Sequence, residues 1–196
     1  MGYTTDFSGE FAVTPPLTKE QVAYIQAFNG SRRMKRNPEV TATLPDPKRL
    51  AVGLPIGEPD AAYYVGSADD GNFGQGTMGG GDDSIIEYNT PPGGARYSLS
   101  ADQGHDHAKA QPGLWCQWTC SDDGTTLHWD GGEKFYSYVE WLKYLIEHFF
   151  DPWGRKLNGE VEWEGEDSSD FGKIKAKNSK VFVHVGRKSY GQPRKV

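Results

Sequence analysis

The chain has 196 residues and a formal net charge of -6, with 36% hydrophobic and 24% charged residues. This length allows one domain, with or without a long insertion, and excludes two full enzymatic domains. The 25 glycines and 12 prolines argue against a helical bundle, and the 13% aromatic residues argue against full disorder. We therefore expect a single domain over residues 1–196.

Hydrophobic stretches are short throughout the chain. None is long enough to span a bilayer, and residues 1–6 do not begin a secretory signal. We therefore expect a soluble protein in the cytoplasm. Cys116 and Cys120 fall in one predicted strand, where four residues separate them by about 13 Å. A disulfide needs a Cα separation below about 7 Å, so we expect two reduced thiols.

Charge is segregated along the chain. Residues 31–50 carry a net charge of +4, residues 57–133 carry -11, and residues 171–196 hold eight basic residues and no acidic one. Three solvated surfaces would explain this pattern. A basic arm and a basic tail (186–196) that contact phosphate, with an acidic middle that meets a basic partner, would explain it as well.

The first predicted elements are a strand over 9–13 and a helix. Pro15 and Pro16 end the strand. Thr18 and Gln21 then form a capping-box pattern. The helix has an apolar stripe at helical spacing and should end within residues 30–33. Its stripe consists of Val22, Ile25 and Phe28.

Residues 34–112 lack periodicity and are punctuated by proline and glycine. Such a length exceeds ordinary loops, which indicates either a covering loop or a partly mobile insertion. Aromatic residues within it favour docking on the body of the domain, whereas residues 98–110 have no such anchors and are expected to be mobile. The anchors are Tyr63, Tyr64, Phe73 and Tyr88.

Regular patterns return at Gly113. Alternation predicts strands over 114–120 and 125–129 joined by a turn at 122–124. A second helix is expected from an N-cap at Asp130, with Glu133 at the box position, to Asp151 and Pro152. Three further strands are predicted over 159–164, 172–177 and 180–185.

The order strand, helix, two strands, helix, strand is the split βαβ order of a ferredoxin-like α+β domain, here with an extra C-terminal hairpin and the long insertion. We expect an antiparallel sheet with both helices on one face. The other face would be exposed to water or covered by the insertion.

Three motifs invite a chemical interpretation. A phosphate-binding glycine loop follows a strand and opens a helix. The glycines of 71–76 and 79–81 do neither in the predicted structure, which argues against such a loop. His105, Asp106 and His107 have metal-ligand types but no further partners on a rigid element. Glu160, Glu162 and Glu164 share one strand face and could act as acid and base or simply keep that face solvated. We expect no cofactor and no metal.

The outward sheet face carries the candidate ligand site. Aromatic, amide, imidazole and carboxylate groups on a rigid face can orient a polar ligand. We expect the segment of Tyr88 and Asn89 to close over this face, and Arg33 to hold an anionic group. In the alternative, the insertion fills the face with protein. The face would gather Trp115, Gln117, Thr126, His128, Glu162, Phe182 and His184.

Several segments together resemble a family of small uncharacterised proteins encoded by bacteriophages and by bacteria such as actinomycetes. The resemblance is most specific over 114–136, and it implies a phage or phage-derived accessory protein inside a bacterial cell. It brings no established reaction. The segments that carry it are 32–34, 88–92, 111–118, 129–136 and 159–166.

The leading functional hypothesis is a non-catalytic factor that binds a host protein or a small phosphorylated ligand and thereby modulates host machinery such as antiviral defence. The alternative is an enzyme acting on a nucleotide or nucleic-acid phosphate, with Glu162 or His128 as acid or base and Arg32 or Arg33 holding phosphate. Nucleic-acid binding through the basic tail is a third, weaker hypothesis.

Overall fold

The computed structural model describes residues 2–66, 83–94 and 110–187. Its main sheet consists of β1 (Thr5–Thr14), β4 (Trp118–Cys120), β5 (Thr126–Trp129), β6 (Lys156–Gly165), β7 (Phe171–Lys177) and β8 (Lys180–Val185). These six strands are antiparallel and lie in the order β4-β5-β1-β6-β7-β8.

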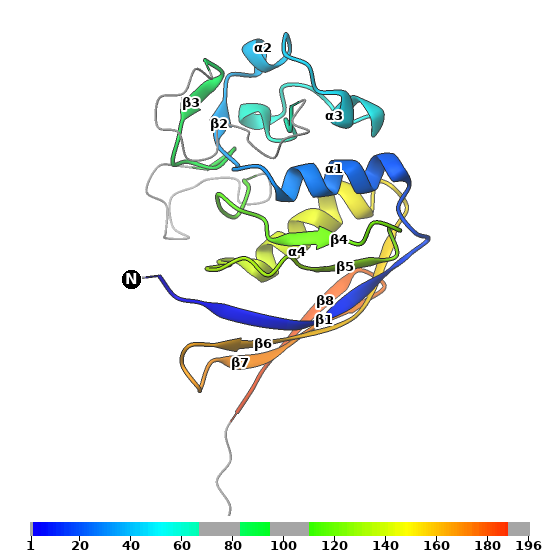
Figure 1. Ribbon diagram of the computed structural model, residues 1–196, viewed down its shortest axis with the longest axis vertical. Coiled ribbons are helices and arrows are strands. Elements are labelled where there is room, and N and C mark those ends of the chain that lie inside the picture. The colour runs from blue at the N-terminus through cyan, green and yellow to red at the C-terminus, as the bar shows by residue number, and fades with distance from the viewer. Residues whose placement is uncertain (1, 67–82, 95–109, 188–196) are drawn as a thin grey trace, which may run out of the picture.

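Two longer helices lie on the same side of this sheet (Figure 1). They are α1 (Lys19–Asn29) and α4 (Tyr138–Leu145), and α4 continues into a π-helical turn, η2 (Ile146–Phe150). The protein is thus a mixed α+β structure with an antiparallel sheet, as the sequence predicts at that level. The helix-covered face is called the inner face below, and the opposite one the outer face.

Alternation along the strands decides which side chains enter the core. Phe11, Leu127, Val161 and Ile174 of neighbouring strands are fully buried on the inner face. The α1 stripe predicted from Val22, Ile25 and Phe28 packs there too, together with Leu142, Leu145 and Phe149 from the second helix. Burial of this apolar surface is the main stabilising contribution to the domain.

The second helix begins later than the sequence predicts. α4 starts at Tyr138, whereas Asp130 accepts a hydrogen bond from the backbone N–H of Gly132 at 2.8 Å and stabilises a loop. Lys134 and Ser137 take positive φ values of 60° and 54°, which a helix cannot contain. The expected N-cap at Asp130 is therefore wrong. The Thr18 and Gln21 capping box is confirmed, with reciprocal bonds of 3.3 and 3.0 Å.

Strands β1 and β6 are longer than predicted and pair over ten residues. Gly9 and Gly159 lie within this ladder with φ values of 100° and 140°. A Cβ at Gly9 would lie 2.6 Å from the Glu160 carbonyl oxygen, and one at Gly159 would lie 2.6 Å from that of Glu10. Glycine therefore permits the close approach of the two strands.

The chain between α1 and β4 forms short elements: β2 (Lys35–Arg36), α2 (Pro38–Thr41), α3 (Pro47–Ala51), η1 (Pro59–Ala61) and β3 (Ile85–Glu87). They lie beyond α1 on the helix side of the molecule (Figure 1), not over the outer face. The expectation that the Tyr88 segment closes over the outer face is therefore wrong. Tyr63 and Tyr64 do dock on the body, since Tyr24 donates a 2.9 Å hydrogen bond to the Tyr63 carbonyl. Phe73, the 98–109 segment and residues 188–196 of the basic tail lie outside the described residues.

Cys116 and Cys120 are free, buried thiols. Burial raises the pKa of each to about 12. Within the described ranges, no helix has both the length and the hydrophobicity that a bilayer span requires.

Candidate functional site

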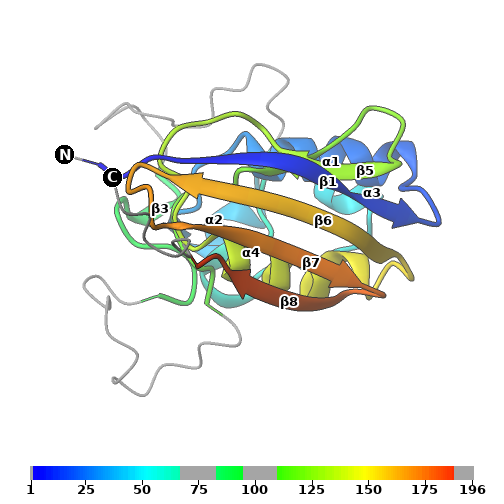
Figure 2. The same ribbon diagram turned by 90° about the horizontal axis from the view of Figure 1, so that it is seen from below.

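The outer face carries opposite charges on neighbouring strands; Figure 2 shows the sheet from this side. Five carboxylates on β1 and β6 form what we call the acidic stripe. Its members are Asp6, Glu10, Glu160, Glu162 and Glu164. The adjacent strand β7 presents Lys173, Lys175 and Lys177 on the same face.

Carboxylates face each other across the β1–β6 ladder. Asp6 is the cross-strand partner of Glu164, and Glu10 is the partner of Glu160. Like charges directly opposite each other destabilise a sheet. Asp6, Glu10 and Glu164 form no ion pair with any other described residue. Among the residues that the structure describes, this part of the outer face therefore keeps negative charge that no ion pair compensates.

Within the acidic stripe, the lysines of β7 form ion pairs with Glu160 and Glu162 only. Lys173 Nζ lies 2.7 Å from Glu162 Oε1 and 3.4 Å from Glu160 Oε1. The bond to Glu162 and the charge of Glu160 raise the pKa of Lys173 above its usual value. Lys175 lies 3.9 Å from Glu160 Oε2. Both lysines are thus already occupied by carboxylates of their own chain.

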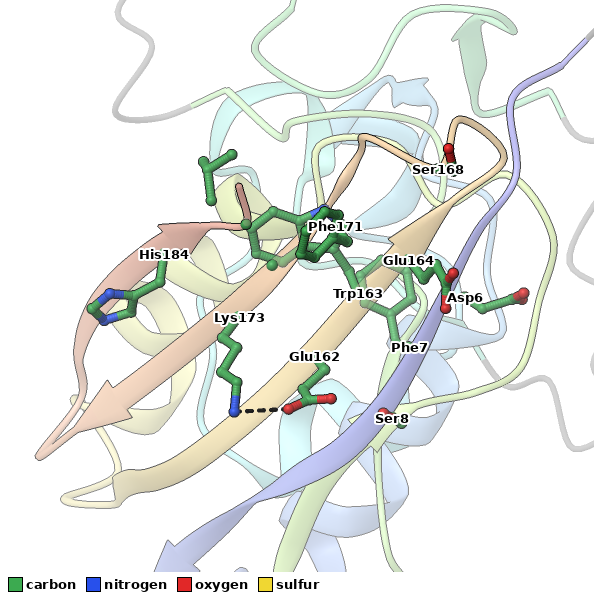
Figure 3. Close-up of a pocket in the computed structure, with 13 residues that line it drawn as sticks. Asp6, Phe7, Ser8, Glu162, Trp163, Glu164, Ser168, Phe171, Lys173 and His184 are labelled. Atoms are coloured by element: carbon green, nitrogen blue, oxygen red, sulfur yellow. Dashed lines mark ion pairs between the residues drawn. The ribbon is translucent and has the colours of Figure 1, made fainter. Parts of the chain in front are cut away.

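An open cleft of about 820 Å³ lies at the end of the sheet where β1 and β7 begin and β6 and β8 end. We call it the sheet-end cleft. Figure 3 shows Asp6 and Glu164 together on one flank, the ion pair of Lys173 with Glu162, and His184 on the other flank. Its remaining lining is largely apolar: Phe7, Trp163, Phe171, Gly172, Val185 and Gly186, with Ser8 and Ser168.

The aromatic part of this lining is held rigidly. Trp163 is 5% exposed, and its Nε1 donates a 3.0 Å hydrogen bond to Asp170. The same carboxylate accepts a 2.8 Å bond from the Tyr3 hydroxyl. Gly172 leaves room for the Trp163 ring, and Gly186 leaves room for the Phe171 ring. A preorganised aromatic wall beside carboxylates suits a cationic, partly apolar group.

Two of the predicted site residues belong to this face. Glu162 lines the cleft. His128 pairs with Thr119, and one further step along the register of Phe11 and Leu127 places it beside Glu10. The predicted outward residues Phe182 and His184 are also exposed on β8.

Trp115 and Gln117 precede β4 and do not join the cleft. Gln117 accepts a 3.1 Å hydrogen bond from Trp129 Nε1 and donates one of 2.7 Å to the Glu133 carbonyl. It therefore fixes the loop between β5 and α4. Trp115 is 36% exposed.

Arg33 lies in the interior, 3% exposed, and not at the outer face. Its guanidinium donates to Gln111, to Ser31 and to the carbonyls of Ala62 and Tyr64 at 2.6–3.2 Å. It also stacks on Phe28, 4.2 Å from the ring centroid. These contacts join the insertion to the body and leave the guanidinium inaccessible to a ligand on the sheet.

Tyr88 and Asn89 meet Arg32 instead of Arg33. Arg32 lies 4.6 Å from the Tyr88 ring centroid and donates a 2.7 Å hydrogen bond to Asn89. β3, which directly precedes Tyr88, lies beyond α1 on the helix side of the molecule (Figure 1), whereas His128 and Glu162 belong to β5 and β6 of the main sheet. The residues of the expected site thus lie in four places: the outer face, the segment before β4, the interior around Arg33, and the contact with Arg32.

Sequence reasoning missed Asp6, Phe171 and Lys173. Alternation could have assigned each of them to the outward face. Their meeting in one cleft depends on the register of Asp6 with Glu164 and of Glu164 with Phe171, which the sequence does not display. His105, Asp106 and His107 lie outside the described residues. Among the residues described, no three metal-ligating side chains gather at one point.

No protein-family model matches the chain, and no curated protein or solved structure shows significant similarity to it.

Proposed function

We propose that the protein is a non-catalytic binding protein whose acidic stripe and sheet-end cleft take a basic segment of a partner protein. One observation carries the proposal: uncompensated carboxylates face each other across β1 and β6 beside a preformed cleft with aromatic walls. The sequence leaves two ligand classes open, a host protein and a small phosphorylated ligand, and the negative charge of the stripe favours a basic segment of a protein.

A cation between facing carboxylates would remove their mutual repulsion. An arginine or lysine of the partner at Asp6 and Glu164 would exchange a like-charge pair for an ion pair, and its stem or guanidinium would contact Phe171. Exposed ion pairs contribute about 0–1 kcal/mol each, so affinity would come from several pairs acting together. The length of the stripe along two paired strands suits an extended basic segment.

A small phosphorylated ligand fits this face less well. Phosphate would meet the carboxylates of the stripe, while Lys173 is engaged by Glu162 and Glu160. Arg33, the residue expected to hold an anion, is buried by its own chain. For the same reason Arg33 is inaccessible to the phosphate of a nucleotide substrate, as the enzymatic alternative would require.

The cellular setting is part of the proposal. The sequence resemblance supports a phage-encoded accessory factor that acts in the cytoplasm of a bacterial host. In that setting the partner would be a host protein with an accessible basic segment, and occupying that segment would modulate the host machinery to which it belongs.

We also propose that the sheet is a ferredoxin-like sheet extended by the hairpin of β7 and β8. The strand order β4-β5-β1-β6 supports this assignment, because a split βαβ repeat inserts β5 between β4 and β1. Both longer helices lying on one face support it as well.

Capture from a bacterial extract tests the proposed function. The immobilised full chain is compared with the double variant Asp6→Asn and Glu164→Gln, which removes two negative charges from the cleft. We expect a protein that the wild type retains, that salt elutes, and that the variant loses.

A matched control removes the same charge elsewhere, through Glu39→Gln and Glu140→Gln in the exposed parts of α2 and α4. This control should retain the same protein, and digestion of the complex should leave a basic fragment bound. Equal loss in both double variants, or a retained fragment without basic residues, would refute the proposal.

A further inference from the structure

Strand β8 ends the sheet with an open, apolar edge. It is the last strand in the order, and Figure 2 shows no described element along its outer side. Three of its exposed side chains are large and apolar: Phe182 is exposed by 47%, Val183 by 45% and Val185 by 69%. Proteins usually protect such edges with charges, proline, bulges or a covering loop.

The register of β7 and β8 identifies which backbone groups point outward. The Gly186 N–H donates a 2.7 Å hydrogen bond to the Phe171 carbonyl, so this residue pair is a hydrogen-bonded one. Antiparallel pairs alternate between hydrogen-bonded and non-hydrogen-bonded positions, and the register continues without a bulge to Lys180. Val181, Val183 and Val185 therefore direct their N–H and C=O groups away from β7.

These three valines are symmetric about Val183. A two-fold axis at Val183, perpendicular to the sheet, places Val183 opposite Val183 of a second copy and Val181 opposite Val185. Every outward N–H and C=O group of β8 then finds a partner in an antiparallel ladder. A closed two-fold interface needs this kind of self-complementary patch.

The side chains also fit this arrangement. On the inner face the valines of both copies become cross-strand neighbours, which buries the exposed Val183 and Val185. On the outer face Phe182 comes opposite His184 of the second copy. Lys180 comes opposite Gly186, which has no side chain, so no like charges face each other directly.

We propose that two copies of this chain pair through β8 into one continuous sheet. The self-complementary side chains, with valine opposite valine on the inner face and Lys180 opposite Gly186 on the outer face, favour a second copy over an unrelated strand. The dimer would place two acidic stripes on one continuous outer surface, and it stands independently of what those stripes bind.

Cysteine cross-linking tests the register. Facing residues at a hydrogen-bonded position have Cα atoms about 5.5 Å apart, within disulfide range. Under mild oxidation Val183→Cys should form a covalent dimer rapidly. Val185→Cys is the matched control, since the two copies of residue 185 would lie about 14 Å apart. Equal linking of both variants, or no linking at position 183, would overturn the proposal.

Sedimentation of the unmodified chain tests the association itself. We expect a monomer–dimer equilibrium that Val183→Lys shifts to monomer, with the dissociation constant raised about tenfold or more, because two ammonium groups would then meet at the axis. Ile86→Lys, at a 56% exposed residue of β3, is the control and should leave dimerisation unchanged. A wild-type chain that stays monomeric up to its solubility limit would show that the edge serves another partner or none.

Discussion

Arg33 has a structural role, whereas its position at the end of a helix predicts a role in anion binding. A guanidinium at a helix end suits anion binding, yet here it donates to neutral acceptors from segments 29 to 78 residues away. Burial lowers its pKa, and its contacts with carbonyl oxygens and with the Phe28 ring offset part of the cost of desolvation. Arg33 therefore stabilises the junction between insertion and body.

Truncating Arg33 should be costly. We expect Arg33→Ala to lower the free energy of unfolding by about 3 kcal/mol, because it removes four hydrogen bonds from the interior and leaves the space over the Phe28 ring unfilled. Arg32→Ala, which loses one hydrogen bond to the exposed Asn89 and the contact with the Tyr88 ring, should lower it by about 1 kcal/mol. Urea denaturation of both variants measures the difference, and equal losses would contradict the structural role of Arg33.

The buried thiol of Cys116 makes the free energy of unfolding depend on pH in the alkaline range. Burial raises its pKa from 9.0 to about 12, so the thiol ionises in the unfolded chain before it ionises in the folded one. The unfolded state then binds fewer protons, and stability falls as pH rises from 9 toward 12. Below pH 9 this group contributes no pH dependence.

Cys116→Ala should therefore flatten the alkaline loss of stability. We expect the slope of unfolding free energy against pH above 9 to become shallower by up to about 1.4 kcal/mol per pH unit. Cys120 and Tyr138, whose pKa values burial raises to about 12, maintain the remaining slope. An unchanged slope in urea titrations at several pH values would show that Cys116 ionises equally in both states.

At the scale of elements, periodicity predicted the two longer helices and the six strands of the main sheet, but neither all of their limits nor the short elements between α1 and β4. The Thr18 cap and the inward Val161 and Trp163 follow from local patterns, and the structure confirms them. The start of α4 depends on positive φ values at Lys134 and Ser137. Neither lysine nor serine favours such values, so the sequence does not predict them. The extension of β1 to Thr5 depends on pairing with β6, a contact between residues more than 140 positions apart.

The candidate site could likewise be predicted only as far as local patterns determine it. Alternation placed Glu162 and His128 on the outward face, because a strand fixes the direction of its own side chains. It could not show that Asp6 meets Glu164, since register between distant strands is a tertiary property. The location of Tyr88 and Asn89 depends on how the insertion docks, which local patterns do not determine.

Gly9 tests the close pairing of β1 and β6. Gly9→Ala should lower the free energy of unfolding by more than about 2 kcal/mol, since it adds a steric clash with Glu160 to the cost of a positive φ. Gly131→Ala is the matched control, because Gly131 has a φ of 84° but nothing within 4 Å of an added Cβ. It should cost only about 1–2 kcal/mol. Equal costs would show that strand proximity adds nothing.

At the scale of the whole molecule, the helix-covered side and the outer face of the sheet differ: the first is packed, and the second presents charged side chains. The short elements between α1 and β4 extend the buried side through contacts such as Gln111 with Tyr144 and Tyr63 with His148. The outer face carries the acidic stripe and the cleft without a described covering segment. A rigid strand surface holds its charges in fixed positions, which favours recognition of a partner by charge pattern.

Titration of the full chain with a hexa-arginine peptide, followed through backbone amide signals, tests the acidic face most directly. We expect shifts along β1 and β6 around Asp6, Glu162 and Glu164. High salt should abolish them, and the Asp6→Asn and Glu164→Gln variant should bind the peptide about tenfold more weakly. The Glu39→Gln and Glu140→Gln control should bind as the wild type does. Shifts that avoid β1 and β6, or equal weakening in both double variants, would contradict a basic-segment site on the outer face.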